Sequence, residues 1–148
     1  GSSNYNALSF TLDGTLLAAG SDGTIARIDL QSGSSSVVGS FADGYGSSGD
    51  FVALSDGRIF ATAVSGSAND VLVQIGESGG QYSQVGVKGD LGYSGVYGLG
   101  FWAGTLYGFD SAGDVLQIDP ASGSATLKGN IGKRWYGAGT TPSAPIFQ

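Results

Sequence analysis

Hydrophobic and polar residues alternate along short segments of this chain. Between residues 7 and 12, Leu8, Phe10 and Leu12 occupy one set of alternate positions, and Ser9 and Thr11 the other. This period of two is typical of a β-strand and does not fit an α-helix. Asp-Gly pairs follow at 13–14 and 22–23, and such pairs favour tight hairpin turns. The first part of the chain therefore predicts four short strands, at 7–12, 15–21, 24–30 and 35–41.

The same pattern recurs further along the chain. When the sequence is shifted by 90 positions, residues 14–39 align with 104–129 without a gap, and 11 of these 26 positions are identical. A less regular copy lies between them, with Asp56-Gly57 in the place of Asp13-Gly14. Since 90 is twice 45, the repeat is about 45 residues long, and a period of this size is typical of propellers and other repeat arrays. It predicts further strands at 51–54, 58–64, 71–75, 82–87, 96–102, 105–109, 115–118 and 125–131.

The predicted organisation is one all-β domain over residues 1–148. It contains three four-stranded antiparallel repeats, at approximately 5–41, 42–89 and 90–131, and a tail at 132–148. Within the tail, Trp135–Thr140 has the position of a first strand in a fourth repeat that does not continue. At 148 residues the chain is long enough to bury a core without disulfides.

The turns resemble those of a known family. Residues 106–110 read Leu-Tyr-Gly-Phe-Asp and residues 118–123 read Ile-Asp-Pro-Ala-Ser-Gly, a pattern similar to the blades of bacterial secreted β-propellers. The first repeat keeps this turn at 28–33, whereas the second departs from it at 75–79. The resemblance implies propeller-like blades, and a β-trefoil or a β-prism is the alternative three-fold fold. It implies no single activity, since the family contains enzymes, lectins, adhesins and structural modules.

Composition restricts the chemistry. The chain has no Cys and no His, only six Lys and Arg, and a net charge of −6. We therefore expect no catalytic residues, no metal site, no cofactor, no nucleic acid partner and no membrane insertion. A glycine motif at Gly44, Gly46 and Gly49 matches a dinucleotide-binding pattern, but a predicted strand follows it, where that pattern requires a helix. The chain is thus expected not to be an enzyme.

Aromatic residues near strand starts and inter-repeat loops are the candidates for ligand binding, because aromatic rings stack on sugars and anchor protein partners. The candidate site residues are Trp102, Trp135, Tyr136, Tyr93, Tyr97, Tyr45 and Arg134. The favoured hypothesis is a non-enzymatic, lectin-like or adhesive binding module that is extracellular or on the cell surface. The alternatives are a self-assembling structural subunit, closed as a ring or extended as a filament, and a glycoside hydrolase that uses carboxylates alone.

Self-association is the expected partnership, alongside a possible glycan or surface-protein ligand. Three blades leave unpaired strand edges at both ends of the array, and exposed edges favour pairing with another chain. Two chains would supply six blades, which is a common number for a closed propeller; the alternative is that the chain is part of a larger propeller. The segment Trp135–Thr140 is then expected to lie along the edge of a neighbouring chain.

Overall fold

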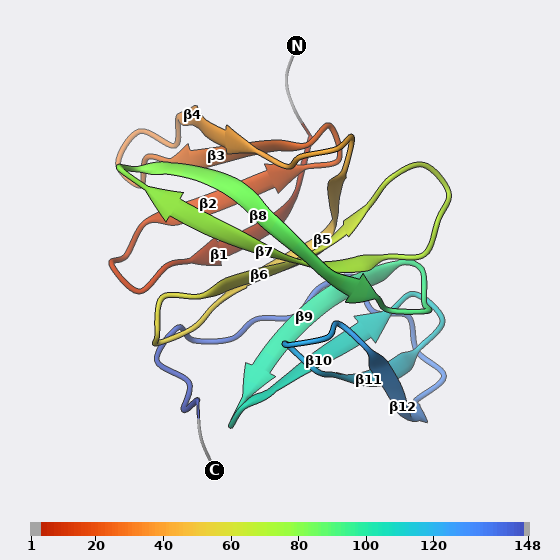
Figure 1. The fold of residues 1–148 in the computed structure, drawn as a ribbon. Helices are drawn as coiled ribbons and strands as arrows, with labels where there is room; N and C mark the ends of the chain where they lie inside the picture. The colour runs from red at the N-terminus through yellow and green to blue at the C-terminus, as the bar shows by residue number, and fades with distance from the viewer. Residues whose placement is uncertain (1–3, 147–148) are drawn as a thin grey trace.

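The chain forms β-strands and no helix over residues 4–146, the part that this computed structural model describes (Figure 1). The all-β prediction is therefore confirmed. No helix in these residues is long and apolar enough to cross a membrane. The twelve strands are β1 (Tyr5–Phe10), β2 (Leu16–Gly20), β3 (Thr24–Ile28), β4 (Ser35–Ser40), β5 (Gly46–Ala53), β6 (Ile59–Val64), β7 (Val71–Ser78), β8 (Gln81–Asp90), β9 (Val96–Trp102), β10 (Thr105–Asp110), β11 (Asp114–Ile118) and β12 (Ala125–Asn130).

The strands form two sheets. Within the runs β1–β4, β5–β8 and β9–β12, each strand pairs antiparallel with its neighbour in sequence. The third run is a separate four-stranded sheet, whereas the first two are joined into one eight-stranded sheet of order β1-β2-β3-β4-β8-β7-β6-β5. The sequence predicted three separate four-stranded units, so this junction is a departure from it.

The junction lies near the start of β8, within the strand predicted at 82–87. β8 reaches across to pair in parallel with β4, through Gly39 with Tyr82 and Ser40 with Ser83. A Cβ atom on Gly39 would lie only 1.6 Å from the carbonyl oxygen of Tyr82. The two backbones can therefore approach this closely only with glycine at position 39.

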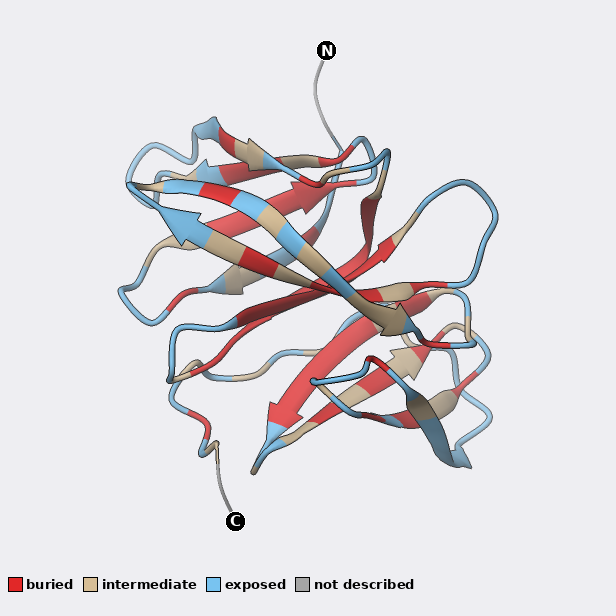
Figure 2. Ribbon diagram, viewed as in Figure 1, coloured by how far each residue is buried: buried red, intermediate tan, exposed pale blue. Residues whose placement is uncertain are grey.

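Two hydrophobic clusters form the core, one at each contact between neighbouring runs. The first cluster joins β1–β4 to β5–β8, with Leu17, Ile25 and Phe51 among its members. The second joins β5–β8 to β9–β12, with Phe60 and Leu99 among its members. Because β5 lies between both partners, all eight of its residues are buried (Figure 2). Full burial of each large apolar side chain contributes roughly 2–3 kcal/mol to folding.

The first strands of the three runs, β1, β5 and β9, lie side by side. Asn6 donates a hydrogen bond from Nδ2 to the carbonyl of Ser47 at 2.8 Å. On the other side, a Cβ on Gly49 would lie 2.5 Å from the Cα of Tyr97. Gly46 and Gly49 of the dinucleotide-like motif thus allow close backbone contact. Both lie within β5, which begins five residues before the predicted strand at 51–54.

The tail forms no strand between residues 132 and 146, where the sequence predicted one. It instead lies along β9 of its own chain. Thr140 Oγ1 accepts a hydrogen bond from the Phe101 amide at 3.0 Å, and the Pro145 carbonyl accepts one from Ala103 at 2.8 Å. Such isolated contacts hold the tail in place without the continuous ladder of a strand.

Two glycines at equivalent turns allow a matched test of the contact between the third run and the end of β8. Gly33 and Gly123 both have a φ of +70°, but a Cβ on Gly33 meets nothing within 4 Å, whereas one on Gly123 would lie 2.5 Å from the amide nitrogen of Gly89. Both alanine variants suffer the left-handed backbone penalty, about 1–2 kcal/mol. We therefore expect Gly123→Ala to lower the free energy of unfolding clearly more than Gly33→Ala does, as measured by urea denaturation. Equal losses in the two variants would show that the contact with Gly89 is not tight.

Candidate functional site

A pocket of about 380 Å³ opens between the first two runs of strands. Its walls come from the β1–β2 turn, from β3, from the start of β6 and from the β7–β8 hairpin. Polar groups from Thr11, Asp13, Arg27, Glu77 and Tyr82 line it together with the apolar side chains of Leu12, Leu54 and Ile59. Its volume falls within the range of roughly 300–1,000 Å³ that is usual for small-molecule sites.

The β7–β8 turn supplies one wall of this pocket. In the first and third runs the corresponding turns begin at Asp29 and Asp119, whose carboxylates accept backbone N–H groups within the turn. In the second run the hairpin instead turns tightly at Gly79 and Gly80, with φ of +60° and +80°. This tight turn brings Glu77 and Gly80 to the pocket.

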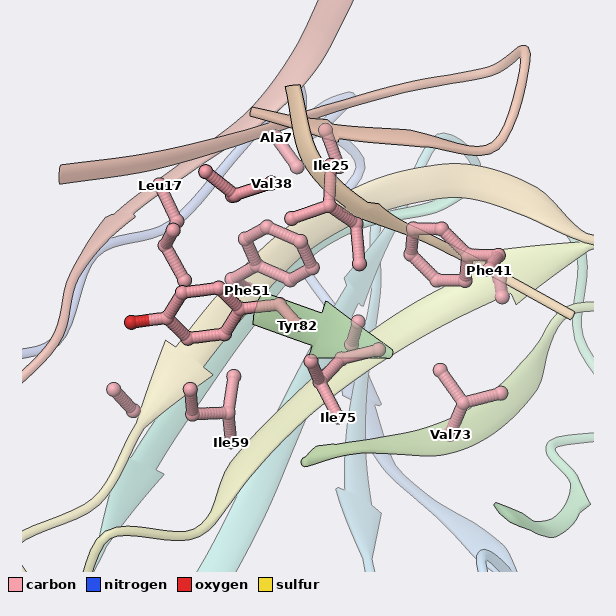
Figure 3. Close-up of a cluster of buried hydrophobic side chains, with 14 residues drawn as sticks. Ala7, Leu17, Ile25, Val38, Phe41, Phe51, Ile59, Val73, Ile75 and Tyr82 are labelled. Atoms are coloured by element: carbon pink, nitrogen blue, oxygen red, sulfur yellow. The ribbon is translucent and has the colours of Figure 1, made fainter. Parts of the chain in front are cut away.

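Tyr82 connects the pocket with the core. Its ring lies among Leu17, Phe51 and Ile59, and its hydroxyl is directed away from the rest of the cluster (Figure 3). Burial raises the pKa of this hydroxyl, the negative charges of Asp13 and Glu77 raise it further, and the nearby Arg27 guanidinium acts in the opposite direction. The hydroxyl is therefore protonated at neutral pH and serves as both donor and acceptor.

The charges around the pocket nearly balance. Asp13 and Glu77 carry one negative charge each and Arg27 carries a positive one. A hydrogen bond from the Thr11 hydroxyl is the main cause that lowers the pKa of Asp13, which keeps this carboxylate ionised. Arg27 reaches the β7–β8 turn, since a Cβ on Gly80 would lie 3.6 Å from its Nη2. This arrangement of acceptors, donors and apolar surface suits an uncharged ligand with many hydroxyl groups better than an anion.

The aromatic candidates from the sequence do not converge on this pocket. Tyr45 packs partly buried against the first core cluster, and Tyr93 against the second. Trp102 ends β9 and is 59% exposed. Tyr82 was not among the predicted site residues, although the departure of the second repeat at 75–79 marked the hairpin that leads to it.

The remaining aromatic candidates lie where the tail meets β9. Tyr97 and Tyr136 stack with ring centroids 6.4 Å apart and an interplanar angle of 12°. Trp135 packs on Phe109 with centroids 5.0 Å apart, and its buried Nε1 has no hydrogen-bond partner. Arg134 is exposed beside it. The structure thus brings together Tyr97 and Tyr136, while Trp135 fixes the tail to the sheet.

Three carboxylates are buried near the contacts between runs. Asp70 Oδ2 accepts the Ser48 hydroxyl and the Val96 amide, each at 2.7 Å, so it links β5 to β9. Asp110 accepts the amides of Ala112 and Asp114. Asp50 accepts the Ala138 amide of the tail. No group of three or more carboxylates within residues 4–146 is placed to hold a metal ion.

No protein-family model and no curated protein matches this sequence. Solved structures do match its fold. One is a Bacteroides thetaiotaomicron protein of unknown function, with a TM-score of 0.61, 16% identity, and coverage of 86% of this chain and 32% of that one. A second is the PQQ-bound aldose sugar dehydrogenase of Streptomyces coelicolor, with a TM-score of 0.58, 19% identity, and coverage of 82% and 46%. A third is a putative oxidoreductase (glucose dehydrogenase) of Thermus thermophilus, with a TM-score of 0.56, 16% identity, and coverage of 82% and 46%.

The fold is β-propeller-like. At these identities the likeness shows the fold alone, and the chain spans less than half the length of each of these three proteins. The comparison corrects one expectation: the sequence was interpreted as that of a non-enzyme, but two chains of the same fold are described as sugar dehydrogenases. The absence of His and Cys therefore does not exclude an enzymatic role.

The raised pKa of Asp50 predicts a specific pH dependence of the free energy of unfolding. Burial raises its pKa from 3.8 to about 6, although the amides of Ala138 and Leu99 partly stabilise the carboxylate. Because the folded pKa exceeds the unfolded one, the stability that Asp50 contributes is complete below about pH 4 and is lost as the pH rises through about 6. Asp50→Asn removes this term, so we expect the variant to gain on the order of 2 kcal/mol relative to the wild type across that range.

The measurement is the urea midpoint of both proteins at several pH values from about 4 to 7.5. The raised pKa of Asp70 affects wild type and variant alike, and cancels in their difference. A difference that stays constant with pH would show that Asp50 titrates normally.

Proposed function

We propose that the chain is a segment of a β-propeller, with three four-stranded blades, whose function is to bind a carbohydrate in the pocket between the first two blades. The observation that carries this proposal is the convergence of Arg27, Glu77, Asp13 and the Tyr82 hydroxyl around an apolar floor. Carbohydrates present many hydroxyl groups on an otherwise apolar ring, so they need paired donors and acceptors beside apolar surface. The Gly- and Ser-rich composition supports an extracellular or cell-surface location as part of the same proposal.

The sugar dehydrogenases among the structural neighbours support this ligand class, because one of them acts on an aldose sugar and another is described as a glucose dehydrogenase. The nearly neutral charge of the pocket supports it too, since a single guanidinium beside two carboxylates offers little attraction to an anion. Sugar binding is required by a lectin and by a sugar-active enzyme alike. The proposal therefore concerns the class of ligand that is bound and not a reaction of that ligand.

The test is isothermal titration calorimetry with a panel of neutral aldoses and their disaccharides, up to about 10 mM, which detects dissociation constants of about 1 mM or below. We expect at least one of these sugars to bind. Tyr82→Phe and Glu77→Gln should each weaken that binding about tenfold, because each removes one buried or charge-assisted hydrogen bond worth about 1–3 kcal/mol.

Tyr97→Phe is the matched control, since it also removes one tyrosine hydroxyl but lies on β9, outside the pocket. It should bind the sugar as the wild type does, and all three variants should keep the wild-type melting temperature to within a few degrees. The proposal fails if no sugar binds, or if Tyr97→Phe weakens binding as much as the two pocket variants.

A further inference from the structure

Four Asp-Gly bonds lie in turns of this chain, at 13–14, 22–23, 43–44 and 56–57. Such a bond can rearrange without an enzyme, because the glycine nitrogen can attack the aspartate carboxyl group and glycine has no side chain to block the approach. The product is isoaspartate, in which the chain continues through the side-chain carbons. The reaction requires that the N–H group and the carboxyl group be free to meet, so the geometry of the turn determines whether it occurs.

Three of the four turns hold the glycine N–H group. In each of them the glycine amide donates a hydrogen bond to the carbonyl three residues earlier: from Gly14 to Thr11 at 3.0 Å, from Gly23 to Gly20 at 3.1 Å and from Gly57 to Leu54 at 3.0 Å. A nitrogen that attacks the carboxyl group must lose its proton and rotate toward the side chain. In these three turns the hydrogen bond has to break before that can happen.

The same three turns also hold the aspartate carboxylate. Each carboxylate accepts the amide two residues later: Asp13 from Thr15 at 3.1 Å, Asp22 from Thr24 at 3.0 Å and Asp56 from Arg58 at 3.1 Å. A hydrogen bond from the Thr11 hydroxyl is the main cause that lowers the pKa of Asp13. A hydrogen bond from the Arg58 side chain is the main cause that lowers the pKa of Asp56. Because the carboxyl group must be neutral before water can leave, these bonds also reduce its reactive form.

The turn at Asp43-Gly44 lacks both restraints. The Tyr45 amide donates a hydrogen bond to the Ala42 carbonyl at 3.0 Å, so Asp43 and Gly44 are the two central residues of the turn. Within residues 4–146, the Gly44 amide donates no hydrogen bond and the Asp43 carboxylate accepts none. Both residues are exposed. The two reacting groups are therefore free to meet, and water reaches them.

The backbone of this turn is also the least favourable of the four for aspartate. Asp43 has a φ of +54° and Gly44 a φ of +74°, and two positive values in succession are typical of a type I′ turn. Aspartate tolerates this region but is less stable there than glycine. In the other three turns only the glycine has a positive φ. The turn at 43–44 thus has both the freest reacting groups and the most strained aspartate.

We propose that Asp43-Gly44 is a site of spontaneous isoaspartate formation in the folded protein, and that the other three turns protect their Asp-Gly bonds. The Gly44 nitrogen loses its proton and forms a bond to Cγ of Asp43, while a carboxyl oxygen leaves as water, and a succinimide ring results. Water then adds to the main-chain carbonyl carbon of Asp43, and the bond from this carbon to the Gly44 nitrogen breaks. The mass is unchanged, but the backbone path contains an additional carbon atom and a new α-carboxylate is free.

The test is to keep the folded protein for several weeks in warm neutral buffer, below its melting temperature. Peptide mass spectrometry with electron-transfer fragmentation then locates isoaspartate. We expect it to accumulate at 43 on the order of tenfold faster than at 13, 22 or 56, because those sites must first break hydrogen bonds of ordinary strength. The same chain in concentrated urea is the control. There the turns are lost, and the four sites should react at similar rates.

Two asparagine variants give a second readout. Asp43→Asn and Asp13→Asn react through the same ring but release ammonia, so a change in mass reports the reaction. Asp13→Asn keeps an Oδ1 acceptor for the Thr15 amide, so it should react on the order of tenfold more slowly than Asp43→Asn in the folded protein and equally fast in urea.

Three results would overturn the proposal. The first is a folded protein in which no isoaspartate forms at 43, and the second is one in which all four sites react equally fast. The third is a preference for 43 that persists in urea, because the neighbouring sequence and not the turn would then be its cause.

Discussion

The structure depends on how the apolar faces of its three runs of strands, β1–β4, β5–β8 and β9–β12, cover one another. The middle run is covered on both sides, which is why β5 has no exposed residue. Within residues 4–146 the three runs make two such contacts, so one face of the first run and one face of the third have no neighbouring run. Because burial of apolar surface is the main source of folding free energy, an uncovered end is the weakest part of such an array.

The outer faces of the first and third runs differ in how they are covered within residues 4–146. At one end the tail lies against the third run and is held by few contacts, among them the packing of Trp135 on Phe109 and the hydrogen bond from Ala138 to Asp50. The raised pKa of Asp50 is a consequence of this cover, since burial is its largest cause. At the other end, Leu8, Phe10 and Val37 of β1–β4 are exposed within residues 4–146.

Much of this arrangement was predictable from the sequence. Alternation at Leu8, Phe10 and Leu12, together with Asp-Gly pairs at regular distances, predicted the strands and the hairpins because both signals are local. The parallel contact between β4 and β8 was not predictable, since it depends on Gly39 meeting Tyr82 far along the chain. The aromatic candidates were chosen by residue type, which cannot separate a ring that plugs the core, such as Tyr45, from one that is free to bind. The pocket could not be predicted from the sequence, because its polar residues come from two different runs and its hairpin departs from the repeat.

The central claim is that the contacts between neighbouring runs of strands carry the stability of the fold. Urea denaturation of Leu99→Ala and Leu8→Ala tests it most directly, because the two leucines have equivalent positions in their runs but Leu99 is fully buried between runs and Leu8 is 56% exposed. We expect Leu99→Ala to lower the free energy of unfolding by about 2–5 kcal/mol and Leu8→Ala by clearly less. Equal losses in the two variants would contradict the claim.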